Sequence, residues 1–201
     1  MKDCLFCQRD KIKDDILLES ENFFVKVGVG ILAPGHVMVI TKGHISCFAE
    51  LPKQIMKEFI SLKNKVTENL KLNFTNPIIY EHGIYGQSIK HAHLHFLPRK
   101  NEYFDLSNIR EVLFNGLKST SIVNMEQLAY IHAKEGSYFY LEIDGDRMVY
   151  HTKDKEAGKY IFRKEFARLT GLTGLENWKS MTENDKQRDR EWIDITKKTF
   201  Q

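Results

Sequence analysis

The spacing of hydrophobic positions in the first hundred residues predicts strands on either side of one helix. β-Branched and aromatic residues fill 23–29 and 36–41, and a Pro-Gly turn at 33–35 lies between them, so we expect an antiparallel hairpin. Apolar residues then recur at intervals of three and four over 51–70, which is typical of an amphipathic helix. A short apolar strand is expected at 77–81. The pattern predicts an α+β fold in which an antiparallel sheet of about five strands packs against this helix.

The second half of the chain has a different pattern. A polar junction at 100–102 marks the boundary, so we expect two units, residues 1–100 and 101–201. Two segments rich in β-formers, at 137–143 and 147–152, are separated by an Asp-Gly pair, which is a strong hairpin signal. The other periodic segments favour helices, and they lie at 109–117, 161–172 and 183–200. We therefore expect the second half to add a β-hairpin and helices that pack on the sheet of the first half.

Three histidines alternate with apolar residues between 91 and 95. Alternate residues of a strand share one face, so His91, His93 and His95 should line one face while the residues between them enter the core. Histidine titrates near neutral pH, so such a row suits nucleophilic, proton-transfer or metal chemistry. A chance cluster on an exposed strand is the alternative. It is disfavoured because the other face of the strand is strongly apolar.

The middle histidine is the best-placed nucleophile. A neutral imidazole nitrogen can attack phosphorus, and the phosphoramidate that forms hydrolyses readily, so one hard displacement becomes two easier ones. His93 has a histidine on each side for this chemistry. Gly86, Gln87 and Ser88 precede the row and offer flexible backbone, an amide and a hydroxyl, which are suitable donors for phosphoryl oxygens. We expect His36 and His82 to be structural.

Two of the three cysteines have the spacing of half a zinc site. Cys4 and Cys7 are separated by two residues, and His44 and His91 are the best candidates for the other two ligands of a tetrahedral zinc ion. A mobile cysteine pair that binds no metal is the alternative. Cys47 lies alone in an apolar stretch, so we expect it to be a small buried hydrophobic residue.

Composition excludes several classes of protein. Hydrophobic content of 42% supports a real core, and charged content of 28% is ordinary for a soluble protein. The net charge of +3 is weak, and the basic residues are interspersed with acids, so charge does not support RNA binding. No apolar stretch approaches the length of a membrane span, and the N-terminus has no apolar signal region. We therefore expect a cytoplasmic protein without a membrane partner.

The motifs together resemble the histidine triad (HIT) superfamily. The segment 86–98, GQSIKHAHLHFLP, resembles the family signature, and the likeness extends to 34–45 and to the N-terminal cysteine pair. It covers roughly residues 1–100. The second half resembles the CwfJ-like branch of the superfamily less strongly. Its likeness rests on 81–83, 137–143, 162–172, Trp178 and a closing charged helix.

The resemblance implies a role for each motif residue. It identifies His93 as the nucleophile that accepts a nucleotidyl group from a substrate's α-phosphate. The phosphate contacts implied are His95 of the motif together with Gln87 and Ser88, which lie on the loop that begins at Gly86. The ligands implied for a structural Zn²⁺ are Cys4, Cys7, His44 and His91. The activity implied is that of a nucleotide phosphohydrolase, acting on dinucleoside polyphosphates, nucleoside phosphoramidates or adenylylated compounds.

Two departures from the family pattern affect this prediction. Many HIT hydrolases carry a ribose-binding carboxylate where this chain has Gly28, so base specificity stays open. The nucleotidyltransferase branch carries glutamine two residues after the nucleophile, and His95 at that position favours hydrolysis. The alternatives are a nucleotidyltransferase or phosphorylase at the same site, or a non-catalytic module that binds nucleotide or RNA. Many members are homodimers, and the second half could cover that surface here, so dimerisation also stays open.

Overall fold

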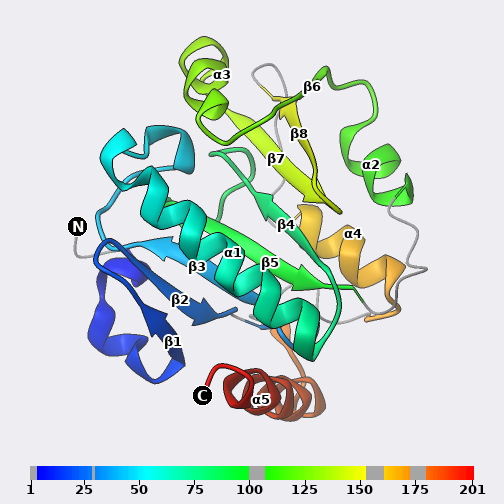
Figure 1. The fold of residues 1–201 in the computed structure, drawn as a ribbon. Helices are drawn as coiled ribbons and strands as arrows, with labels where there is room; N and C mark the ends of the chain where they lie inside the picture. The colour runs from blue at the N-terminus through cyan, green and yellow to red at the C-terminus, as the bar shows by residue number, and fades with distance from the viewer. Residues whose placement is uncertain (1–3, 29, 100–106, 153–160, 173–179) are drawn as a thin grey trace.

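The sheet extends through both halves of the chain (Figure 1). The structure, a computed structural model, describes residues 4–28, 30–99, 107–152, 161–172 and 180–201. Within them one antiparallel sheet has eight strands in the order β1-β2-β3-β5-β4-β7-β8-β6. The strands are β1 Ile16–Glu19, β2 Phe23–Val27, β3 Val37–Thr41, β4 Pro77–Glu81, β5 His93–Pro98, β6 Ser119–Ser121, β7 Tyr138–Ile143 and β8 Asp146–His151.

The expectation of about five strands is wrong for the whole sheet. Five strands do come from the first hundred residues, but β4 is not an edge, because its backbone pairs with β7 from Ile79–Glu142 to Glu81–Tyr140. The predicted hairpin, β7 and β8, therefore extends the sheet instead of packing on it. The division into residues 1–100 and 101–201 stays a prediction, and the junction at 100–102 lies outside the described residues.

Five α-helices and several short 3-10 turns surround the sheet in the described part of the chain. The helices are α1 Met56–Asn73, α2 Ser107–Phe114, α3 Gln127–Glu135, α4 Ile161–Leu169 and α5 Glu183–Lys198. The short turns are η1 Leu5–Cys7, η2 Arg9–Lys11, η3 Lys13–Asp15, η4 Phe48–Glu50 and η5 Lys53–Ile55. The predicted helix at 51–70 starts later than expected, because Pro52 has extended backbone angles and a 3-10 turn precedes Met56. None of the described helices is long and apolar enough to cross a membrane.

The alternation of side chains along the strands gives the sheet two apolar faces. On one face, strand residues such as Val39, Leu94 and Ile79 pack against the buried stripe of α1, which crosses the sheet in Figure 1. The opposite face carries two further apolar clusters. One joins the N-terminal turns to β2 and β3 through Phe6, Ile12, Phe24, Met38 and Ile40. The other joins α2 and α4 to β4, β5 and β7.

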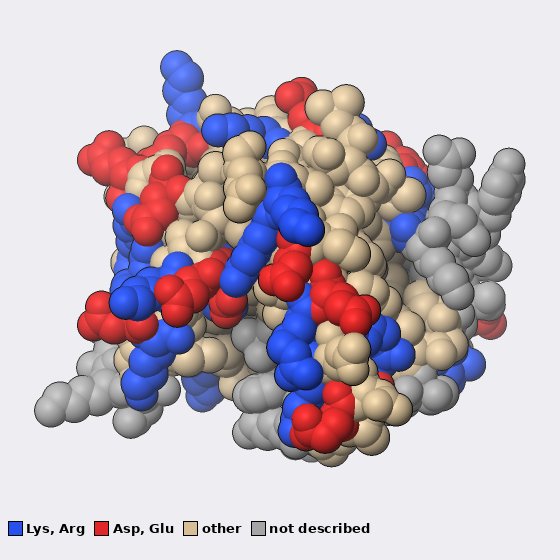
Figure 2. All heavy atoms as spheres, turned by 90° about the horizontal axis from the view of Figure 1, so that it is seen from below, with Lys and Arg blue, Asp and Glu red and all other residues tan. Residues whose placement is uncertain are grey.

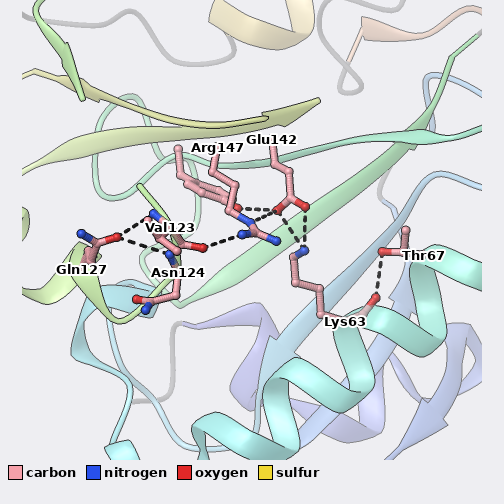
Figure 3. Close-up of polar contacts among 8 residues, drawn as sticks. Lys63, Thr67, Val123, Asn124, Gln127, Glu142 and Arg147 are labelled. Carbon is pink, nitrogen blue, oxygen red and sulfur yellow. Dashed lines mark hydrogen bonds and ion pairs between the residues drawn. The ribbon is translucent and has the colours of Figure 1, made fainter. Parts of the chain in front are cut away.

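A buried ion pair fixes α1 to the second half of the sheet (Figure 3). The Lys63 ammonium of α1 lies 2.9 Å from the carboxylate of Glu142 in β7. Arg147 of β8 lies 3.4 Å from the same carboxylate and donates to the backbone carbonyl of Val123. The amide oxygen of Gln127, which begins α3, accepts from the Val123 N–H at 2.7 Å. The network therefore links α1, the hairpin and the start of α3.

Candidate functional site

Two of the three motif histidines share a face of β5. Ala92, Leu94 and Phe96 are fully buried in the core on the α1 side, as predicted. His93 and His95 point to the opposite face, and their ring centroids are 5.0 Å apart. The expected single row of three is wrong, because β5 begins at His93 and His91 precedes it.

The ring of Phe6 packs against both His91 and His93. Its centroid lies 5.7 Å from the ring of His91 and 5.2 Å from that of His93. His91 is turned toward the N-terminal cysteines, with its Nδ1 3.4 Å from the Cys4 sulfur. The motif therefore serves two sites instead of one.

The geometry of His93 leaves one ring nitrogen with a lone pair. Its Nδ1 lies 2.6 Å from the backbone carbonyl of His91, and a carbonyl can only accept, so Nδ1 carries the proton. In a neutral imidazole, Nε2 is then the unprotonated nitrogen. Burial lowers the pKa of His93 to about 4, so the ring is neutral at pH 7. A neutral imidazole with a free Nε2 lone pair is the form that can attack phosphorus.

His95 has the opposite tautomer. The Leu32 N–H donates to Nδ1 of His36 at 3.3 Å, so His36 carries its proton on Nε2. That Nε2 lies 3.1 Å from Nδ1 of His95 and donates to it. Burial lowers the pKa of His36 to about 3, which keeps this donor ring neutral. A neutral His95 therefore carries its proton on Nε2 and presents a hydrogen-bond donor beside the nucleophile.

His36 belongs to this site although sequence reasoning assigned it only a structural role. It lies one residue before β3, on the same face as His95. Its place in the apolar strand segment gave no signal of chemistry, because the contact depends on β3 pairing with β5. His82, also expected to be structural, lies close by, with its ring centroid 6.2 Å from that of His95.

The loop before the motif has one buried polar side chain, Gln87, and one exposed polar side chain, Ser88. The Gln87 amide nitrogen donates to the carbonyl of His91 at 3.1 Å and to that of Ser46 at 3.0 Å. It therefore holds the same carbonyl that fixes the ring of His93. Ser88 is exposed, and Gly86 has a φ of +67°, a conformation that favours glycine. Contact of these residues with phosphate stays a prediction.

Gly28 lies where there is little room for a side chain. A Cβ at this position would lie 3.2 Å from Nδ1 of His36 and 3.2 Å from Ile31, so a larger side chain would disturb the histidine pair. A carboxylate nevertheless reaches this segment from α5, because Asp189 accepts from the Ile31 N–H at 2.7 Å. Sequence reasoning missed it, since the two residues are distant along the chain and the helix pattern carries no signal of its packing.

The four predicted metal ligands do lie together. The Cys4 sulfur is 3.4 Å from Nδ1 of His91, and the Cys7 sulfur is 3.6 Å from the same atom and 3.3 Å from Nδ1 of His44. Tetrahedral zinc with ordinary bond lengths would hold sulfur and nitrogen ligands about 3.6 Å apart. Nε2 of His91 lies 2.7 Å from the Thr41 carbonyl, to which it donates, so Nδ1 faces the sulfurs. The four side chains can hold a metal ion, and their donor set suits zinc.

A second group of ligand atoms lies near α3. Cys47, Glu50 and His132 bring one donor each to within 4.8 Å of one another. Burial and the negative charge of Glu81 raise the pKa of Cys47 to about 12, so its thiol is protonated at pH 7. Metal ligation needs the thiolate, which makes this group a poorer match than the N-terminal four.

A cavity that described residues line lies away from the motif histidines. A cavity of about 520 Å³ lies past the other end of β5, where Pro98, Phe166 and Trp192 are among its lining residues. None of the three motif histidines lines it. Figure 2 shows the face around α5, where basic and acidic side chains are mixed instead of forming a basic patch.

Comparison with known proteins places the first half of the chain in a family. The family model for the HIT domain matches residues 9–102. An uncharacterized HIT-like protein from Methanocaldococcus jannaschii is 31% identical over 101 residues, which cover 48% of this chain and 78% of the relative. Adenosine 5′-monophosphoramidase HNT1 from Saccharomyces cerevisiae is 23% identical over 101 residues, which cover 49% of this chain and 64% of that protein.

Solved structures of similar proteins carry related titles. A HIT family hydrolase from Clostridium thermocellum is 24% identical, covers 51% of this chain and 95% of its own, and has a TM-score of 0.43. A zinc-bound histidine triad family protein from Mycobacterium smegmatis is 19% identical, covers 64% of this chain and 89% of its own, and has a TM-score of 0.42. The likeness of the second half to the CwfJ-like branch stays a prediction. From its HIT domain at residues 9–102 and its archaeal relative, the chain belongs to the HIT family.

Proposed function

We propose that this protein is a nucleotide phosphohydrolase that works through a covalent intermediate on His93. The observation that carries the proposal is the 2.6 Å contact between Nδ1 of His93 and the His91 carbonyl, which leaves Nε2 free to attack. The name of the yeast relative, adenosine 5′-monophosphoramidase, supports the substrate class. The substrates proposed are nucleoside phosphates with a phosphate-linked leaving group.

The reaction has two displacements at phosphorus. In the first, the Nε2 lone pair of His93 forms a bond to the α-phosphorus, and the bond to the leaving group breaks with its electron pair on that group, which takes a proton from solvent. In the second, water attacks the same phosphorus, the P–N bond breaks, and its electron pair returns to Nε2 while the water loses a proton. The products are a nucleoside monophosphate and the free leaving group.

The neighbours of His93 act on charge and position. While phosphorus is bound to Nε2, the ring is cationic, and the His91 carbonyl stabilises it through the hydrogen bond from Nδ1. Gln87 holds that carbonyl in place. The Nε2–H of His95 donates to a phosphoryl oxygen, where negative charge builds up in the transition state.

We propose that the four-ligand cluster of Cys4, Cys7, His44 and His91 binds zinc in a structural role. The ion would fix the N-terminal turn to the segment that begins the catalytic strand. All four ligands are protein atoms, as in closed structural sites, so no position remains for a substrate. Residues of the cluster then position His93 by way of the His91 backbone.

The test is the variant His93→Ala, assayed with adenosine 5′-phosphoramidate. We expect kcat to fall by about a thousandfold or more, because nucleophile and intermediate are both lost, while affinity for AMP stays largely intact. His151→Ala, on β8 away from the site, is the matched control and should keep full activity. Mass spectrometry of the wild-type enzyme, quenched without acid during turnover, should find the nucleotidyl group on the peptide that contains His93.

Two results would contradict this proposal or redirect it. Full turnover by the His93→Ala variant would end it. Formation of an acceptor-linked nucleotide in place of free monophosphate, when phosphate or another acceptor is added, would indicate a transferase at the same site.

A further inference from the structure

Glu81 carries a buried carboxyl group that the proposed mechanism does not use. It ends β4, which lies between β5 and β7 in the sheet (Figure 1), and it is fully buried. One of its oxygens accepts from the Phe48 N–H at 2.7 Å, and the other accepts from the Tyr138 hydroxyl at 2.6 Å. Burying a carboxyl group is costly unless its oxygens find hydrogen-bond partners. Glu81 therefore ties η4, in the first half of the chain, to β7 in the second.

Tyr138 is the contribution of the second half of the chain. It begins β7 and is fully buried. Its hydroxyl donates to Glu81 and also accepts from the Ala49 N–H at 3.2 Å, so it holds η4 directly as well. Its backbone N–H donates to the carbonyl of Gly83 at 3.0 Å. Tyr138 therefore fixes both η4 and the start of the loop that follows β4.

The residues just before η4 contact the histidine motif. The Ala92 N–H donates to the carbonyl of Ile45 at 2.7 Å. The Gln87 amide donates to the carbonyl of Ser46 at 3.0 Å and to that of His91 at 3.1 Å. A shift of the segment 45–49 would therefore displace Ala92 and Gln87 from their present positions.

The last link is the contact that orients the ring of His93. Its Nδ1 donates to the His91 carbonyl at 2.6 Å, and this bond keeps the ring proton off Nε2. The same carbonyl accepts from Gln87, so its position depends on what Gln87 holds at its other end. A displaced carbonyl would weaken the bond from Nδ1 and let the proton occupy Nε2 in part of the molecules. A protonated Nε2 has no lone pair for attack on phosphorus.

We propose that Tyr138 positions the nucleophile His93, acting through Glu81, the segment 45–49 and Gln87. This proposal rests on the proposed function and makes Tyr138 a positioning residue, which does not touch the substrate. Each noncovalent link is a hydrogen bond of 2.6–3.2 Å. The HIT domain then depends on the second half of the chain for the tautomer of its nucleophile.

A neighbouring pair on β7 separates this role from general stability. Tyr140 is also fully buried, and its hydroxyl donates to the carboxylate of Glu142. That carboxylate meets Lys63 and Arg147 (Figure 3), so this pair holds α1 and the hairpin. Removal of either tyrosine hydroxyl costs one buried hydrogen bond to a glutamate. Tyr140→Phe is therefore the matched control for Tyr138→Phe.

The test reads the tautomer of His93 from long-range ¹H–¹⁵N NMR spectra at pH 7, together with kcat and KM for adenosine 5′-phosphoramidate. In the wild type and in Tyr140→Phe we expect the proton on Nδ1 alone. In Tyr138→Phe we expect a second tautomer with the proton on Nε2. We also expect its kcat to be about tenfold lower with KM unchanged, because the variant binds substrate but holds the nucleophile less well.

Glu81→Gln tests the next link and keeps the test decisive if Tyr138→Phe unfolds. The glutamine keeps an oxygen for the Phe48 N–H, and its amide can donate to the Tyr138 hydroxyl oxygen. We therefore expect a smaller share of the second tautomer and a kcat about threefold below that of the wild type.

An unchanged His93 tautomer in a folded Tyr138→Phe protein, or in Glu81→Gln if the tyrosine variant unfolds, would overturn the proposal. Equal changes in Tyr138→Phe and Tyr140→Phe would overturn it as well, because they would indicate a general loss of packing. The tautomer is read without turnover, so an active His93→Ala enzyme would end the proposed function and leave this result standing.

Discussion

Gly83 lies where the loop after β4 turns against Tyr138. Its φ is +51°, and a Cβ there would lie 2.5 Å from two carbons of the Tyr138 ring. Tyr138 is fully buried, and its hydroxyl donates to the carboxylate of Glu81 at 2.6 Å. The ring therefore has no room to move. A hydrogen atom is the only side chain that this position accommodates.

Gly83→Ala should lower the free energy of unfolding by about 2–5 kcal/mol, from left-handed backbone strain together with the clash. Gly116→Ala is the control, since Gly116 has a φ of +73° and nothing within 4 Å of its Cβ position. It should cost only about 1–2 kcal/mol, the strain alone. Urea unfolding measures both, and equal losses in the two variants would show that the clash contributes nothing.

Single residues of the site differ in how far the sequence predicts them. The four metal ligands were predicted because cysteine and histidine have few other reasons to recur at such spacing. The opposite tautomers of His93 and His95 were not predictable, because each depends on a hydrogen-bond partner from elsewhere in the fold.

At the scale of elements, strong periodicity was a reliable guide. The hairpin of β2 and β3, helix α1 and the Asp-Gly hairpin of β7 and β8 all formed where apolar spacing or turn chemistry predicted them. Three elements were missed. They are β1 Ile16–Glu19, β6 Ser119–Ser121 and α3 Gln127–Glu135. The two strands are short edges with exposed residues, and α3 buries only two side chains, so none shows a clear hydrophobic pattern.

The ion pair between α1 and β7 should respond unequally to loss of either partner (Figure 3). Glu142→Gln leaves the buried Lys63 ammonium without its carboxylate and should cost about 3–5 kcal/mol of stability. Lys63→Met should cost about 2 kcal/mol or less, because Glu142 keeps Arg147 and the hydroxyl of Tyr140. Thermal and urea unfolding of both variants provide the measurement.

The control for this pair lies on the surface of α5. Lys186 pairs with Glu183 at 2.6 Å, and both side chains are exposed. Lys186→Met should leave the unfolding midpoint unchanged, because solvent screens an exposed pair. The proposed asymmetry would be wrong if Lys63→Met were as damaging as Glu142→Gln.

At the scale of the whole molecule, the two halves meet at several places. In the sheet, β4 pairs with β7, and on the α1 side Lys63 pairs with Glu142. On the histidine face, α4 packs on Tyr80, and Asp189 of α5 accepts from the Ile31 N–H. On the same face, the N-terminal segment packs against His93 through Phe6. The proposed zinc ion would hold this segment to His44 and His91, far along the chain. Homodimerisation stays a prediction.

Removal of the metal should therefore loosen the N-terminal segment. We expect a single zinc ion per chain by elemental analysis, and a melting temperature lowered by about 5–10 °C after chelation, restored by added zinc. Cys7→Ser should lose the metal. Cys47→Ala, which alters the other cysteine group, should keep it. Zinc retained by Cys7→Ser but lost from Cys47→Ala would place the metal near α3 instead.

The sequence alone determined the family, the α+β class, the main elements of the first half and the residue types that carry the chemistry. These follow from local information, namely side-chain periodicity, turn residues and the spacing of histidine and cysteine. Tertiary structure alone decided that the sheet continues into the second half, that His36 orients His95, and that Tyr80 stacks between His95 and Phe162. Each of these depends on contacts between distant segments, and strand pairing and helix packing set such contacts without leaving a mark in local sequence.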